Sequence, residues 1–194
     1  MLSSLTALVV GAGPGGLAAA LALLQAGLRV TVVERAPALV PVGAGLTLFP
    51  NGLRSLDRIA AGLGAAIADA GRECRVVLAR DDLGAARGES HPTLRERFGY
   101  GLVNLRWSDL TARLAARLPA GALRLGLALQ RAEERDDGVS FDLSDGTTDR
   151  ADLLVAADGV HSALRRRLLD DGPPSDTGHL SWRLLLPPRH DLLP

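Results

Sequence analysis

A glycine-rich turn close to the start of the chain has the composition and spacing of a phosphate-binding motif. The turn consists of Gly11, Ala12, Gly13, Pro14, Gly15 and Gly16. Gly11 permits a tight turn, Gly13 leaves space for a diphosphate against the backbone, and Gly16 lets a helix pack closely on a strand. The N–H groups at the start of that helix would face the diphosphate. The turn therefore predicts a dinucleotide site.

An acidic residue stands where such a site needs one. Glu34 lies 18 residues after Gly16, at the end of the next apolar run. A carboxylate there can accept hydrogen bonds from both ribose hydroxyls of an adenosine. Its charge disfavours a 2′-phosphate, although Arg35 beside it could reverse that preference. These residues alone do not choose between NAD and FAD.

The elements that would position the turn are a strand, a helix and a second strand. Residues 5–10 form a short apolar run, residues 17–26 have high helix propensity with Gly27 ending the helix, and residues 29–33 form the second strand. Such a βαβ unit binds nucleotides in α/β folds. The uncharged stretch at 2–28 is broken by the glycines and lacks a preceding basic segment, so we expect no membrane span.

The rest of the chain alternates short helical and strand patterns. Helices are expected at 51–59, 62–70, 108–118 and 161–169, the third with Ser108 as its N-cap. Strands are expected at 72–80, 101–105, 122–125, 128–134, 139–143, 152–157 and 180–186. Loops are expected at 36–49 and 81–99, the latter a polar surface excursion, with hairpin turns at 136–138 and 144–146.

The composition argues against several classes of partner. The 22 basic and 22 acidic residues cancel, so no basic field favours nucleic acid. Cys74 is the only cysteine and lies in an apolar run, so we expect an inert thiol and neither a disulfide nor a cysteine metal site. A reducing, cytoplasmic location fits this usage. Three histidines are scattered in loop-like sequence, so no metal site is expected: His91, His179 and His190.

Three further segments carry a family resemblance. They are GAGLTLFPNGL at 43–53, LRWSDL at 105–110 and ADLLVAADGVHSALR at 151–165. Together with the glycine turn, in this order and spacing, they resemble the class A flavoprotein monooxygenases, the group that includes salicylate and hydroxybenzoate hydroxylases. The third segment is the most specific, because it is similar to the family's Asp-Gly motif between a buried strand and a helix.

The resemblance implies a fold and a division of the chain. The fold would be α/β, a Rossmann-like FAD-binding domain of the glutathione-reductase type with an added small β-sheet. Residues 1–170 would form this domain, with a substrate-domain excursion around 72–100. Residues 171–194 would begin a truncated substrate-binding region, which Trp182-Arg183 weakly resembles.

The resemblance also implies roles around the cofactor. The glycine turn would hold the FAD diphosphate, Glu34 the adenosine ribose, and Arg35 would lie along the adenine. The segment from Gly43 to Gly45 would pass near the isoalloxazine, where the absence of side chains lets the ring swing.

Two more positions match family motifs, each with a simpler alternative. Arg106 would reach the phosphate or ribityl region, although it could be a surface cation near a helix start. Asp158 and Gly159 would serve FAD and NAD(P)H binding with support from Arg165, although Asp158 could be a simple turn acid. His161 is better explained as a loop or capping residue than as a base.

By the same resemblance, the whole enzyme would take NAD(P)H as co-substrate and insert one oxygen atom of O₂ into a small aromatic-type molecule. No residue demands the role of catalytic acid, base or nucleophile, so the catalytic residues stay unknown. The family's later Gly-Asp motif and long helix do not occur in this sequence. The chain would therefore be partial or truncated, and its partner would be a missing C-terminal half or a complementary chain.

Three other interpretations stay open. The chain could be another flavoprotein of the same fold, such as a reductase or a halogenase. It could be a non-catalytic, truncated flavin-binding module. An NAD-dependent Rossmann dehydrogenase is disfavoured, because the segments at 43–53 and 152–165 have no role there.

Overall fold

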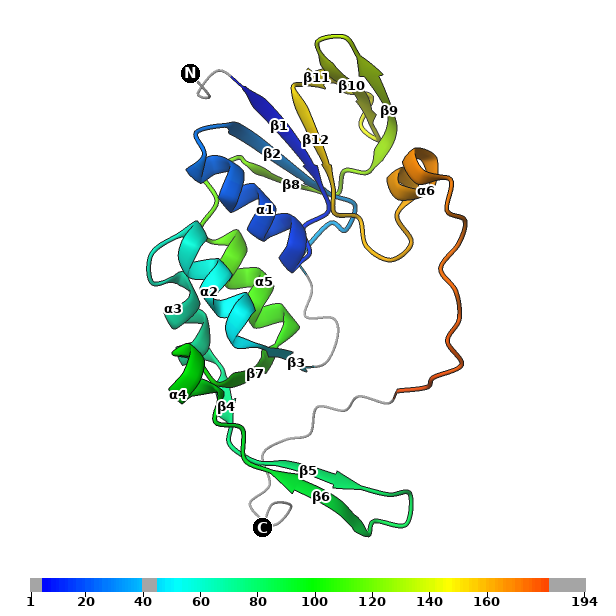
Figure 1. Ribbon diagram of the computed structural model, residues 1–194. Coiled ribbons are helices and arrows are strands. Elements are labelled where there is room, and N and C mark those ends of the chain that lie inside the picture. Colours follow the sequence, from blue (N-terminus) through cyan, green and yellow to red (C-terminus); the bar gives the residue numbers. More distant parts are fainter. Residues whose placement is uncertain (1–4, 40–44, 182–194) are drawn as a thin grey trace.

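A four-stranded parallel sheet forms the centre of the fold (Figure 1). The computed structural model describes residues 5–39 and 45–181. The strands of this sheet are β1 (Thr6–Val10), β2 (Arg29–Glu34), β8 (Leu123–Leu125) and β12 (Leu153–Ala156). Their order is β12-β1-β2-β8, and every neighbouring pair is parallel. This is the 3-2-1-4 order of doubly wound sheets, which confirms the predicted α/β class.

Helix α1 (Pro14–Gln25) joins β1 to β2 and covers one face of the sheet. Ala7 and Val9 of β1 point to this face and join the same apolar cluster as Leu17 of the helix. The helix ends as predicted, because Gly27 has φ +91° and its N–H donates to the Leu24 carbonyl at 3.0 Å. It begins three residues earlier than expected, since proline suits a first helical turn.

A three-stranded antiparallel sheet covers the opposite face. It consists of β9 (Leu129–Arg135), β10 (Gly138–Leu143) and β11 (Thr148–Ala151), in the order β11-β10-β9. Leu8 and Val10 of β1 pack here against Phe141 and Leu143. Because both faces of β1 are buried, residues 7–10 of this strand are a continuous apolar run in the sequence. Strand β11 was not predicted, because most of it is polar and exposed.

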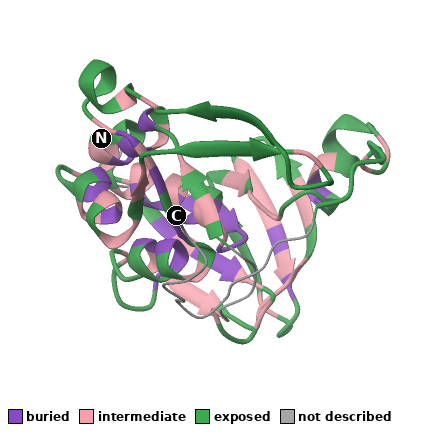
Figure 2. Cartoon of the chain, turned by 90° about the horizontal axis from the view of Figure 1, so that it is seen from below, coloured by how far each residue is buried: buried purple, intermediate pink, exposed green. Residues whose placement is uncertain are grey.

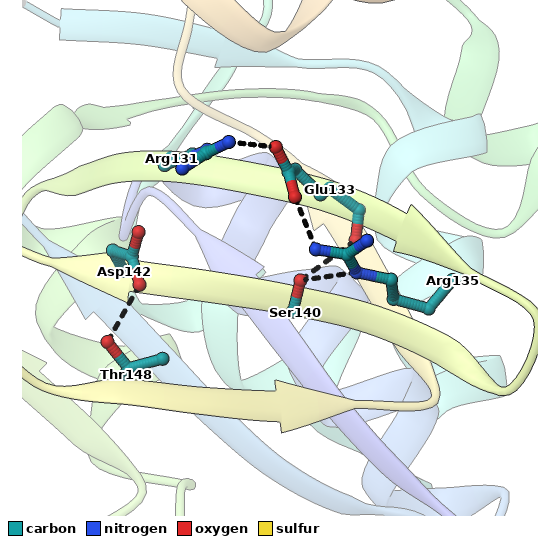
Figure 3. Close-up of polar contacts among 6 residues, drawn as sticks. All are labelled: Arg131, Glu133, Arg135, Ser140, Asp142 and Thr148. Atoms are coloured by element: carbon teal, nitrogen blue, oxygen red, sulfur yellow. Dashed lines mark hydrogen bonds and ion pairs between the residues drawn. The ribbon is translucent and has the colours of Figure 1, made fainter.

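The outer face of this antiparallel sheet carries polar contacts (Figure 3). Glu133 accepts hydrogen bonds from Arg131 and, at 2.5 Å, from Arg135, and these alternate residues of β9 share one face. Thr148 donates to Asp142 at 2.8 Å across the neighbouring strands. Exposed pairs of this kind stabilise little, so this is a solvated surface.

A layer of helices lies beside α1, and a further three-stranded sheet adjoins it. The helices are α2 (Pro50–Ile59), α3 (Leu63–Ala70) and α5 (Trp107–Ala115). The sheet has the antiparallel order β3-β7-β4, with β3 (Gly45–Leu48), β7 (Leu102–Arg106) and β4 (Arg72–Cys74). It confirms the predicted additional small β-sheet.

Two predictions about this layer were wrong. Residues 45–48 were expected to be loop but form β3. The strand depends on its hydrogen bonds to β7, and four residues are too few to show a strand pattern in the sequence. Helix α5 begins at Trp107 with Arg106 as its N-cap, so Ser108 lies inside the first turn. Strand β7 runs directly into the helix, which leaves no room for a separate capping residue.

A hairpin projects from this layer (Figure 1). It consists of β5 (Val77–Arg80) and β6 (Ala86–Ser90), and α4 (Leu94–Phe98) follows it. The predicted single strand at 72–80 is therefore two strands in different sheets, and the predicted loop at 81–99 contains a strand and a helix. Both hairpin strands are exposed along their whole length (Figure 2), so they have no burial pattern that a sequence could reveal.

The last helix, α6 (Ala163–Leu169), packs Leu164 against the second apolar cluster. Beyond it the chain has no helix or strand as far as residue 181. Most of the strand predicted at 180–186, together with Trp182-Arg183, lies outside the described residues. None of the described helices has the length and apolarity needed to cross a membrane.

Candidate functional site

A cleft lies at the carboxyl ends of β1, β2 and β12. Its volume is about 360 Å³. Ligands of open α/β sheets bind outside the carboxyl ends of the strands, where the strand order reverses. The sequence-predicted site residues that line it are Gly11, Gly13, Glu34, Arg35, Asp158 and Gly159.

A larger cleft does not coincide with any predicted site. It measures about 510 Å³ and lies between the parallel sheet and the antiparallel sheet, where Arg29 and Arg150 line it. It contains none of the residues of the glycine turn. We therefore place the candidate site in the smaller cleft, where the motifs converge.

Two glycines of the turn are required by the packing of the protein itself. Gly11 has φ +106°, and a Cβ there would lie 2.3 Å from the Ala157 carbonyl oxygen. A Cβ on Gly16 would lie 2.0 Å from the Gly11 carbonyl oxygen. These contacts bring β1, α1 and the end of β12 into close approach, as the fingerprint predicts.

Gly13 is different, because no protein contact requires a glycine there. Its φ of −69° and ψ of 171° are open to any residue. The nearest atom to a Cβ built at this position is Cζ2 of Trp107, at 3.9 Å. The missing side chain therefore leaves room in the cleft rather than relieving a clash.

The start of α1 is suited to an anion. Its N-cap, Gly13, has no side chain to accept from the first turn, and that turn has no acidic residue. Pro14 at the first position contributes no N–H. The remaining first-turn N–H groups and the positive end of the helix dipole would favour a diphosphate.

The Glu34 carboxylate is held in place by two backbone N–H groups. Its Oε2 accepts from Ala12 at 2.8 Å, and its Oε1 accepts from Ala36 at 2.9 Å. A carboxylate oxygen has two lone pairs, so each oxygen retains one acceptor site. The side chain is thus fixed at the cleft and able to accept further hydrogen bonds.

Asp158 stands at the end of β12 beside the glycine turn. Its Oδ2 accepts from the Ala163 N–H at 3.1 Å, at the start of α6. Its Oδ1 is buried and has no hydrogen-bond partner within the described part of the chain. Nε of Arg165, expected to support this motif, lies 3.2 Å from Oδ2 of Asp171 instead.

A second group of predicted residues lies on the sheet formed by β3 and β7. Gly45 is directly opposite Arg106 in the ladder, and both are exposed. Arg106 precedes Trp107, whose ring approaches Gly13, so this sheet edge adjoins the glycine turn. Gly43 lies outside the described residues. Sequence reasoning gave Trp107 no role, although its place after Arg106 at a helix start was a signal.

The family is decided by comparison with known proteins. Residues 4–171 match the family model described as "FAD binding domain". The chain belongs to the class A flavoprotein monooxygenase family. This match confirms the resemblance inferred from the motifs and indicates FAD rather than NAD as the bound dinucleotide.

Relatives of the family are longer than this chain. A 3-amino-4-hydroxybenzoate 2-monooxygenase of Streptomyces cremeus is 42% identical over 168 residues, which cover 85% of this chain and 42% of the relative. A 6-hydroxynicotinate 3-monooxygenase of Bordetella bronchiseptica is 34% identical, with 92% and 47% covered. The crystal structure of Klebsiella pneumoniae HpxO with FAD and uric acid superposes with a TM-score of 0.78 and 31% identity, with 90% and 44% covered. The chain thus spans less than half the length of these relatives.

The side chains of Tyr100 and Glu73 have shifted pKa values, and both lie outside the candidate cleft. The Tyr100 hydroxyl donates to Oδ2 of Asp57 at 2.5 Å, and this hydrogen bond raises the pKa of Tyr100. Arg95 donates to Glu73 at 2.7 Å, which lowers the pKa of that carboxyl. The first pair joins α2 to the segment between α4 and β7, and the second joins α4 to β4. None of these residues lines the cleft. Within residues 5–39 and 45–181, no cluster of three His, Cys, Asp or Glu side chains could hold a metal.

Proposed function

We propose that this chain is the FAD-binding part of a monooxygenase that uses NAD(P)H and O₂ on a small aromatic or heteroaromatic molecule. The observation that carries the proposal is the cleft at the strand ends, where the start of α1, with no side-chain cap, adjoins the room left by Gly13. The substrate class is supported by the names of the relatives, which act on an aminohydroxybenzoate and a hydroxynicotinate.

The cleft supports the roles that the resemblance implies around the adenosine half. The turn from Gly11 to Gly16 and the start of α1 would hold the diphosphate. Glu34 would accept from the ribose with the acceptor sites that Ala12 and Ala36 leave open. Arg35 lines the same cleft and would lie along the adenine.

The roles around the flavin half are those that the family resemblance implies, and the pairing of Gly45 with Arg106 in the neighbouring sheet supports two of them. Gly45 and Gly43 would pass the isoalloxazine, and Arg106 would reach the ribityl or phosphate region. Asp158 has a buried acceptor oxygen that a ligand hydroxyl would satisfy, and Gly159 beside it keeps the cleft open. Bound FAD would supply the electron transfer from NAD(P)H to O₂, while these residues bind and orient it.

The test is a titration of the purified chain with FAD, followed by flavin fluorescence. The wild-type chain should bind FAD, and excess NAD should not displace it. Gly13→Val should weaken binding by about tenfold or more, equivalent to about 1.4 kcal/mol, by filling the space for the diphosphate. Its thermal midpoint should fall only by the amount that losing a glycine N-cap costs, because the backbone angles of Gly13 suit any residue. An unchanged FAD signal on mixing, with tight NAD binding, would refute the proposal.

A second candidate function is a flavin-binding module without catalysis. It is favoured by the candidate site, whose predicted residues in the cleft are all suited to holding a dinucleotide. The two candidates differ in one assay, NAD(P)H oxidation by the FAD-loaded chain with hydroxybenzoates and hydroxynicotinates. Turnover supports the enzyme, and FAD binding without turnover supports the module.

We further infer that catalysis requires a region equivalent to the relatives' other half, as a continuation of this chain or as a complementary chain. Strand β12 is an edge of the parallel sheet, and apolar side chains near it are exposed: Leu153 by 40%, Leu168 by 69% and Leu169 by 68%. Parallel sheets are normally covered, so such a surface favours a partner. A reading frame after the codon for Pro194 that encodes a Gly-Asp motif would support this inference, and its absence together with turnover by the chain alone would contradict it.

The division of the chain and its location belong to the same proposal. Residues 1–170 would form the FAD-binding domain, the hairpin within 72–100 would extend toward the substrate region, and 171–194 would begin that region. A cytoplasmic location is inferred from the single cysteine and the NAD(P)H requirement. Cell fractionation tests it, and recovery of the protein outside the cytoplasm would contradict it.

A further inference from the structure

We propose that Trp107 forms one wall of the diphosphate site over Gly13, so that its indole covers bound FAD there. This inference rests on the proposed function, since it concerns the same cofactor. Neither the glycine fingerprint nor the Asp-Gly motif marks this residue.

The indole of Trp107 lies next to the position that a side chain at Gly13 would occupy. Cζ2 of Trp107 lies 3.9 Å from a Cβ built on Gly13, and apart from Ala12 and Pro14 no other described residue comes within 4 Å of that position. In the dinucleotide fingerprint, this missing side chain gives the diphosphate its approach to the backbone. An indole beside that approach must flank whatever occupies it.

Trp107 is poorly explained as a core residue. It remains 40% exposed, whereas Leu110 and Leu114 of the same helix are 3% and 1% exposed. It is the first residue of α5, directly after the exposed Arg106. A large apolar side chain left uncovered beside an anion site is suited to a ligand with both charged and aromatic parts.

The physical effect follows from the chemistry of the side chain. An aromatic wall excludes water from one side of the diphosphate, which strengthens its hydrogen bonds to the N–H groups of α1. The indole also has an N–H donor that suits a phosphate oxygen. Arg106 would then supply positive charge to the diphosphate, and the adjacent Trp107 would shield the diphosphate from water.

The experiment measures FAD affinity of the full chain and of Trp107→Ala, Trp107→Phe and Phe98→Ala. Trp107→Ala should raise the Kd for FAD by about three- to tenfold, the size expected for losing one aromatic contact. Trp107→Phe should stay within about threefold of wild type, because it keeps a ring. Phe98 is 36% exposed on α4, so Phe98→Ala is the control for removing an exposed aromatic and should leave the Kd unchanged.

The response of the indole fluorescence to ADP supplies a readout that a merely structural role would not give. The sequence has two tryptophans, so Trp182→Phe leaves Trp107 as the single emitter. FAD should quench this emission almost completely and in parallel with the binding curve, and ADP should shift it, because the diphosphate is common to both ligands. This readout also decides the case if Trp107→Ala does not fold.

The outcomes separate the two proposals. Absence of FAD binding by the wild-type chain would overturn the proposed function and this inference with it. Normal FAD binding by the wild type and equal binding by Trp107→Ala would overturn this inference alone. Quenching by FAD without any response to ADP would also overturn it, because the indole would then lie away from the diphosphate.

Discussion

Replacing Gly16 by alanine tests the packing that holds the start of α1 at the site. The added Cβ would stand 2.0 Å from the Gly11 carbonyl oxygen and 3.1 Å from Cβ of Ala157. Ordinary contact begins near 3.4 Å, and the closest atom belongs to the backbone, so α1 must retreat by more than about 1 Å. Overpacking of this kind costs about 1–3 kcal/mol, and the short distance favours the upper end. Alanine regains about 1 kcal/mol of helix propensity, which leaves a net loss of about 2 kcal/mol.

Gly15→Ala is the matched control, because it lies one position earlier in the same turn. A Cβ there meets no atom within 4 Å, so the substitution gains propensity without a clash. The free energy of unfolding, measured by urea denaturation without FAD, should fall for Gly16→Ala and stay equal or rise for Gly15→Ala. For a domain of this size, the loss at Gly16 corresponds to a thermal midpoint lower by about 4–8 °C.

Equal stability of the two variants would refute this packing argument. If Gly16→Ala is as stable as Gly15→Ala, then α1 does not approach β1 as closely as the structure places it. The explanation of the fingerprint by close packing would then fail, and the start of α1 would need another positioning contact.

Two further predictions concern pH. Tyr100→Phe should lower the free energy of unfolding by about 1–2 kcal/mol at neutral pH, because it removes the donor to Asp57. That hydrogen bond raises the pKa of Tyr100. The difference in unfolding free energy between Tyr100→Phe and wild type should therefore persist below the pKa of tyrosine in the unfolded chain, near 10, and disappear as the pH rises through the pKa in the folded protein. A difference that stays constant to alkaline pH would contradict this prediction. In Asp152, hydrogen bonds from the Thr6 hydroxyl and N–H lower the pKa. Asp152→Asn should therefore lower the free energy of unfolding above a pH of about 4, and this loss should vanish as acid protonates the wild-type carboxyl. An equal loss of unfolding free energy in acid would count against this prediction.

Much of the site could be predicted because its residues stand at the carboxyl ends of strands. The glycine turn follows β1, Glu34 ends β2, and the Asp158-Gly159 pair comes after β12. Parallel strands bring their carboxyl ends to one edge of the sheet. Gly45 and Arg106 were identified only by family resemblance. Their direct pairing depends on β3, which a loop-like stretch with glycines and prolines concealed.

The elements that were missed share one physical property. Strands β6 and β11 and helix α4 have no buried residue except Ala151, so their side chains follow no burial period. Secondary-structure prediction from sequence depends on such a period. The two strands are held by pairing with β5 and β10 instead, and α4 is joined to β4 by the Arg95–Glu73 ion pair. The same reasoning explains why the strand predicted at 72–80 divides between two sheets.

The parallel-sheet core, the glycine turn and the position of Glu34 could be read from the chain alone, because apolar runs and glycine spacing are encoded within short stretches. The roles of the individual glycines needed the folded contacts, since a side chain at Gly11 or Gly16 would meet backbone while one at Gly13 would approach only an indole. Folding also brought Trp107 to the turn, across more than 90 residues of sequence. Contacts of that separation depend on how helices pack, and no local pattern records them.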